Sequence, residues 1–126
     1  MSKPPLNLIK GKENIFIHIG PSMNPTLKTA DVVEVAPCGS AGLKPGDIIV
    51  FRSPDDTKNI SHRVIRIEGE KVFTRGDNNN KPDDYSIDSS KLIGRVVRAE
   101  RGKKPLHLFG GAAGQIWALG LHLLRR

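Results

Sequence analysis

Short apolar runs, separated by turn-forming residues, make up most of the first hundred residues. The runs lie at residues 15–19, 31–35, 47–52, 60–68, 72–75 and 92–99. Clusters of Gly, Pro, Asn and Asp separate them, and helical periodicity is weak before residue 112. Strand-length runs bounded by such clusters are typical of antiparallel β-sheets. The pattern therefore predicts a mainly β fold that coils into a barrel-like arrangement, with a short C-terminal helix.

Two of the runs carry specific expectations about burial. In residues 15–19 isoleucines alternate with Phe16 and His18, so we expect the isoleucines on the buried face and His18 on the other. Residues 47–52 are almost continuously apolar, as in a strand that is buried on both faces. The sequence Glu-Gly-Glu-Lys at 68–71 predicts a hairpin turn.

The length of 126 residues is that of a single domain. We divide it into a polar lead-in at 1–13, a β domain at 14–104 and a C-terminal segment at 105–126. Cys38 is the only cysteine, which excludes an intrachain disulfide. We expect a monomer without a cofactor.

The C-terminal segment combines positive charge with apolar residues. The net charge of +7 arises entirely from residues 91–126. Residues 106–124 contain no Lys, Arg, Asp or Glu, but their four glycines make a poor membrane span. A helix here would lie in a membrane interface with Trp117 at headgroup level, or would pack on the barrel. Because residues 1–10 lack an apolar run, we expect any membrane association through 105–126.

One serine stands at the apex of a turn that a glycine and two prolines restrict. Ser22 lies in Gly20 to Leu27, directly after the first strand. A histidine, His62, follows in a later strand, and an acidic loop at 76–86 follows that. Serine, histidine and aspartate from separate segments are able to act as nucleophile, base and orienting group. The loop offers Asp77, Asp83 and Asp84, and its spacing does not fit an EF-hand, so we expect no metal.

The order of these segments resembles signal peptidase I of the S26 family. The matching segments are Ser22 to Leu27, Gly46 to Phe51, His62 to Ile65 and Gly76 to Asn79. The resemblance is to the branch with a Ser-His pair, found in archaea, spore-forming bacteria and the endoplasmic reticulum. It implies the coiled β-barrel fold that signal peptidases share with LexA-like repressors.

The resemblance also implies an activity and a set of catalytic residues. The protein is expected to be a membrane-associated serine endopeptidase that cleaves signal peptides, or similar N-terminal segments of preproteins, after small residues. Ser22 would be the nucleophile and His62 the base. Of the acidic residues, Asp83 would pair with His62 and Asp77 would organise the loop, with Asp84 as the alternative partner one position away.

The oxyanion and the substrate need further groups. The backbone N–H of Ser22 is available as an oxyanion donor, whereas Pro21 has none. Gly20 stands where some relatives carry a helpful hydroxyl, so a second donor is not visible. Met23 and Ile17 are candidate walls of a substrate groove, and both also suit a core.

Two other functions fit parts of the sequence. A LexA-like regulatory peptidase would use lysine as its base and carry a DNA-binding domain in front, for which about 13 residues leave no room. A non-catalytic basic β-barrel that binds nucleic acid would explain the +7 charge. The few aromatic residues form no evident base-stacking platform, so we expect no nucleic acid partner.

Overall fold

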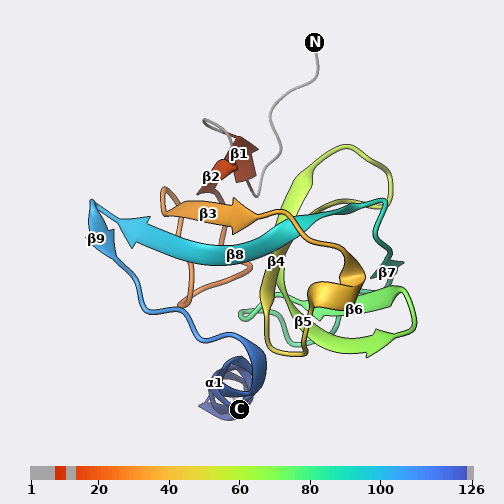
Figure 1. Ribbon diagram of the computed structural model, residues 1–126. Coiled ribbons are helices and arrows are strands. Elements are labelled where there is room, and N and C mark those ends of the chain that lie inside the picture. The colour runs from red at the N-terminus through yellow and green to blue at the C-terminus, as the bar shows by residue number, and fades with distance from the viewer. Residues whose placement is uncertain (1–7, 11–13, 125–126) are drawn as a thin grey trace.

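The computed structural model describes residues 8–10 and 14–124, which form one antiparallel β-sheet and a C-terminal helix (Figure 1). The strands are β1 (Leu8–Lys10), β2 (Ile15–His18), β3 (Val32–Ala36), β4 (Ile48–Arg52), β5 (Asn59–Glu68), β6 (Lys71–Arg75), β7 (Ser86–Ile87), β8 (Leu92–Arg101) and β9 (Lys104–Pro105). A 3-10 turn, η1 (Ser40–Gly42), precedes β4, and α1 (Gly111–Leu124) ends the described chain. The prediction of a mainly β fold with a C-terminal helix is confirmed.

The strands follow the order β1-β2-β3-β8-β4-β5-β6-β7, and β9 pairs with the end of β8 at Glu100 and Arg101. The long strand β8 therefore lies between β3 and β4, and Figure 1 shows it curving across the molecule with α1 below it. Register shifts interrupt the β3–β8 pairing between Glu34 and Val35, and the β4–β8 pairing between Val50 and Phe51. Such bulges bend and twist a sheet, which suits its curling into a half-barrel.

The curled sheet encloses two hydrophobic cores. The first contains Phe16, Met23, Leu27, Val33, Val35, Ile48, Val50 and Ala99. The second contains Leu43, Ile49, Phe51, Ile60, Val64, Val72, Ile87 and Leu92. Strand β4 alternates between them, since Ile48 and Val50 face one core while Ile49 and Phe51 face the other. This confirms that the apolar run at 47–52 forms a strand buried on both faces.

The expected orientation of β2 was wrong. Phe16 and His18 are buried, with exposed fractions of 2% and 0%, whereas Ile15 and Ile17 are only half-buried. The register explains this result, because Phe16 lies opposite Val33 of β3, and both residues belong to the first core. The alternation was read correctly, but the face was assigned to the wrong set of residues.

The segment at 1–13 contains a strand that the sequence did not indicate. Leu8–Lys10 pairs with β2 along its whole length and adds an edge strand to the sheet. The rest of the lead-in, residues 1–7 and 11–13, lies outside the described residues. The division of the chain at 13 and 104 stays a prediction.

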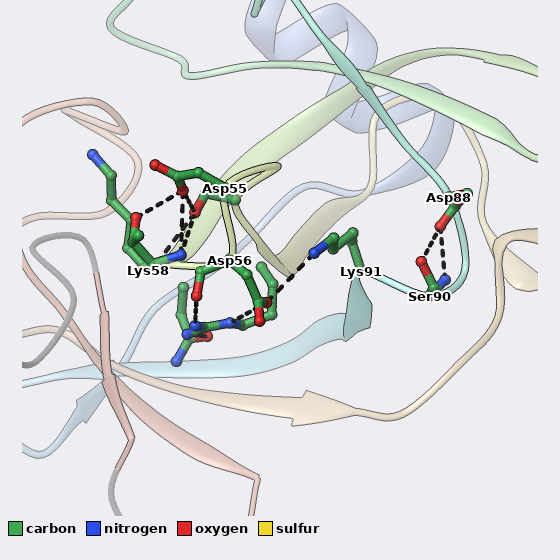
Figure 2. A network of polar contacts seen from close by, with 10 residues as sticks. Asp55, Asp56, Lys58, Asp88, Ser90 and Lys91 are labelled. Atoms are coloured by element: carbon green, nitrogen blue, oxygen red, sulfur yellow. Dashed lines mark hydrogen bonds and ion pairs between the residues drawn. The ribbon is translucent and has the colours of Figure 1, made fainter. Parts of the chain in front are cut away.

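Polar contacts connect the β4–β5 turn with the segment that enters β8 (Figure 2). Hydrogen bonds from Ser53 and Thr57 lower the pKa of Asp55 to about 2, and its carboxylate holds the turn closed. Lys91 lies 3.5 Å from the neighbouring carboxylate of Asp56. These contacts fix the start of β5, the strand that carries His62.

Candidate active site

The Ser22 turn, residues 20–27, lies in the connection between the paired antiparallel strands β2 and β3. Pairing continues beyond the strands, because the His18 N–H donates to the Asp31 carbonyl and the Ala30 N–H to the His18 carbonyl, each at 2.8 Å. The chain leaves β2 at Gly20, whose φ of +100° favours glycine. The Asn24 N–H then donates to the Pro21 carbonyl at 3.0 Å. This bond closes a tight turn with Ser22 inside it.

Two apolar side chains anchor the turn in the first core. Met23 and Leu27 are both fully buried. Met23 therefore lies in the core and does not line an open groove, which contradicts its expected role as a substrate wall. Ile17 is half-buried on β2, and its contact with a substrate stays a prediction.

His62 lies on β5 and pairs with Asp83 of the acidic loop. Its Nδ1 is 2.6 Å from Asp83 Oδ2, and the two side chains are 7% and 10% exposed. The Thr74 hydroxyl donates to the same carboxylate oxygen at 2.5 Å, and the Asp83 N–H donates to the Thr74 carbonyl at 2.8 Å. A carboxylate on Nδ1 favours the tautomer that leaves Nε2 free to accept a proton. Asp84, the alternative partner, is exposed.

The Ser22 turn and the His62 ring meet at Gly76. A methyl group on Gly76 would lie 2.5 Å from the Ser22 carbonyl oxygen and 3.1 Å from His62 Nε2, so only glycine fits there. The Ser22 carbonyl also accepts a hydrogen bond from the Asn78 N–H at 2.9 Å. Ser22 Oγ and His62 Nε2 are both buried without a hydrogen-bond partner among the described residues, so no hydrogen bond joins them here. Catalytic hydrogen bonds are often long without substrate.

Asp77 pairs with Arg63 and not with His62. Arg63 donates from Nε and Nη2 to the two Asp77 oxygens at 2.9 and 2.8 Å, and both side chains are 1% exposed. Asp77 also accepts from the Thr26 hydroxyl at 2.5 Å, and its N–H donates to Met23 Sδ at 3.3 Å. Asp77 thus fastens the acidic loop to the Ser22 turn and to β5.

Gly20 is not a ready oxyanion donor. Its N–H donates to the Thr29 hydroxyl at 3.0 Å, and its carbonyl lies 3.1 Å from His18 Nε2. Gly20 therefore shapes the entry to the turn, and a contribution of Gly20 to the oxyanion hole stays a prediction. The role of the Ser22 N–H as a donor stays a prediction.

His18 is a second buried histidine close to the site. Burial lowers the pKa of His18, and the nearby His62 lowers it further, while the Gly20 carbonyl and Asp31 act in the opposite direction. The unfolded chain takes up a proton below about pH 6.5, and the folded protein does so only at lower pH.

We expect the free energy of unfolding to fall as the pH drops below 6.5, the ordinary pKa of histidine. His18→Gln keeps a donor for the Gly20 carbonyl and cannot titrate, so it should remove this part of the pH dependence. Between pH 7.5 and 5.5 the free energy of unfolding should fall by up to about 1.4 kcal/mol more in the wild-type protein than in the variant. Urea unfolding at pH 7.5 and 5.5 measures it. Equal slopes would show that His18 does not contribute.

Several residues that complete the site carried little signal in the sequence. Thr26 and Thr74 hold the two aspartates, and threonine is common in strands and turns. Arg63 carried some signal, because it is a charged residue next to the β-branched Val64 and Ile65 in a predicted strand. Within residues 8–10 and 14–124, no three His, Cys, Asp or Glu side chains are grouped to hold a metal ion.

Comparison with known proteins identifies the family of this chain. The profile of the family described as signal peptidase, peptidase S26, matches residues 14–100. The chain belongs to the S26 signal peptidase family. The matched range contains Ser22, His62 and Asp83 and ends before α1.

Curated relatives of this S26 chain include mitochondrial inner membrane protease subunit 1 from three animals. The protein from Homo sapiens is 45% identical over 58 residues, which cover 44% of this chain and 35% of the human protein. The Mus musculus protein is 43% identical over 58 residues, and the Xenopus tropicalis protein 42% over 64. The matches thus span about a third of the length of these relatives. No solved structure gave a significant match.

Proposed function

We propose that this S26 protein is a serine endopeptidase in which Ser22 attacks the peptide carbonyl and His62 is the base. The observation that carries the proposal is the buried pair of His62 and Asp83. In this pair His62 Nε2 is free, and both Nε2 and the Ser22 carbonyl oxygen lie beside Gly76. His62 accepts the Ser22 proton as Oγ attacks, and then donates it to the leaving amine. Asp83 stabilises the imidazolium formed in between. The Ser22 N–H donates to the oxyanion.

The substrate is an extended peptide with a small residue before the scissile bond, as the family suggests. The acyl-enzyme that forms on Ser22 is then hydrolysed by water, with His62 again acting as the base. The test is to incubate the protein with a peptide that has alanine at this position and to identify products by mass spectrometry. Wild-type protein should cleave it and Ser22→Ala should not.

Helix α1 supports membrane association. Its exposed apolar side chains are Ile116, Leu119, Leu123 and Leu124, with exposed fractions of 72%, 57%, 53% and 84%. Lys103 and Lys104 are exposed at the β8–β9 turn, which precedes the helix in the sequence. An exposed apolar helix face suits the surface of a bilayer, and the positive charge of residues 91–126 suits acidic lipid. We propose that α1 rests on such a surface, which would place the protease near membrane-bound substrates.

None of the helices in the described part of the chain is long and apolar enough to span a bilayer. The names of the curated relatives refer to an inner membrane protease, and this agrees with work at a membrane surface.

We expect the protein to bind vesicles that contain acidic lipid and to bind phosphatidylcholine vesicles more weakly. Replacing Ile116 and Leu119 with serine should weaken binding at least tenfold, because each side chain buries apolar surface worth about 1.5–3 kcal/mol when fully buried. Co-sedimentation measures the bound fraction. Equal binding of the variant and the wild-type protein would exclude this face as the contact.

A further inference from the structure

Helix α1 is attached to the sheet mainly through polar contacts with residues of the site. Only Gly114 and Ala118 of the helix are buried. A methyl group on Gly114 would lie 2.3 Å from the Gly46 carbonyl oxygen and 2.7 Å from Arg63 Nη1, so the backbones approach closely. Arg63 Nη1 also donates to the Phe109 carbonyl at 2.6 Å, just before the helix. The same arginine thus binds Asp77 and the start of α1.

A directed chain of hydrogen bonds runs from the helix into the Ser22 turn. The Trp117 indole N–H donates to Thr26 Oγ1 at 2.9 Å. The Thr26 hydroxyl in turn donates to Asp77 Oδ2 at 2.5 Å. An indole nitrogen only donates and a hydroxyl has one hydrogen, so the direction of both bonds is fixed. The indole N–H is therefore bonded within the protein and is not presented to lipid headgroups.

This chain of hydrogen bonds ends at Asp77, beside the catalytic groups. Thr26 is buried in the same turn as Ser22, four residues further along. Asp77 follows Gly76, where an added methyl group would lie 2.5 Å from the Ser22 carbonyl oxygen and 3.1 Å from His62 Nε2. Because Gly76 is tightly packed between Ser22 and His62, a shift of Thr26 or Asp77 is transmitted to both of these residues.

We propose that Trp117 is a positioning residue for Ser22, acting through Thr26 and Asp77. This inference rests on the proposed peptidase function. Helix α1 thus helps to hold the Ser22 turn against His62, in addition to its proposed contact with a membrane surface. Removing the indole N–H leaves the buried Thr26 hydroxyl without one donor and loosens the turn, which slows the chemical step more than it weakens substrate binding.

The test compares Trp117→Phe, which keeps an aromatic ring against Phe109, with Thr26→Val and with Gln115→Ala on the exposed surface of the helix. Trp117→Phe should lower kcat about three- to tenfold with KM within about twofold, on a soluble peptide without lipid. Adding it to Thr26→Val should lower kcat no further, because both remove the same chain of hydrogen bonds. Gln115→Ala should match the wild-type protein.

Three results would overturn the proposal: wild-type kcat in folded Trp117→Phe, additive effects of the two substitutions, or an equal loss in Gln115→Ala. If the wild-type protein cleaves no peptide, the peptidase function fails separately. The coupling is then measured by the backbone amide chemical shifts of Ser22 and Gly76 in NMR spectra. Trp117→Phe should move both shifts and Gln115→Ala neither, and unmoved shifts in Trp117→Phe would overturn the proposal.

Discussion

Ser22→Ala is expected to lower kcat for peptide hydrolysis by about 10⁴-fold or more, since no other group in the site replaces the nucleophile. The same substitution should leave the fold intact. Ser22 Oγ is buried without a hydrogen-bond partner in the described chain, so its removal should keep or slightly raise the free energy of unfolding. Product formation followed by mass spectrometry gives the rate, and urea unfolding gives the stability. Continued cleavage by folded Ser22→Ala would mean that another residue is the nucleophile.

Asp83 and Asp84 provide a matched pair of controls in the same loop. Asp83→Asn keeps the shape of the His62 partner but favours the wrong tautomer, so kcat should fall about 10³- to 10⁴-fold. Asp84 is exposed, and Asp84→Asn should keep kcat within about twofold. The reverse result would show that the loop presents Asp84 to His62 during catalysis.

Arg63→Met is expected to lower the free energy of unfolding by about 3–5 kcal/mol, because it leaves the Asp77 carboxylate buried without its cation. Both side chains are 1% exposed, and methionine fills part of the volume without replacing any hydrogen bond. The variant also loses the bonds to the Gly46 and Phe109 carbonyls. Since small domains are stable by about 5–15 kcal/mol, the loss should be large in urea unfolding.

Two variants separate the buried pair from a general effect of lost charge. Arg98→Met removes an arginine that is 74% exposed and 3.5 Å from Glu34, and it should cost less than about 1 kcal/mol. Adding Asp77→Leu to Arg63→Met removes the uncompensated carboxylate and should recover a large part of the stability. A cost of Arg63→Met no greater than that of Arg98→Met would contradict the importance of the pair.

The sequence by itself determined the longer strands and the family. The strands at 48–52 and 59–68 begin and end within one residue of the apolar runs at 47–52 and 60–68. This agreement arises because strand propensity and turn chemistry depend on a few neighbouring residues. The four ordered segments identified the family, and the S26 match confirms it. The family resemblance also implied Asp83 rather than Asp84 as the partner of His62, and the structure has the Asp83 contact.

Only the tertiary structure decided which partner each buried polar group takes. The buried face of β2 depends on its register with β3, and the alternation in the sequence is the same whichever face is buried. Asp77 was expected to organise the loop, but the sequence did not indicate that its partners are Arg63 and Thr26. Trp117 contacts Thr26 across 91 positions of the sequence. Local patterns specify elements, whereas contacts between distant segments depend on how the sheet curls and where the helix packs against it.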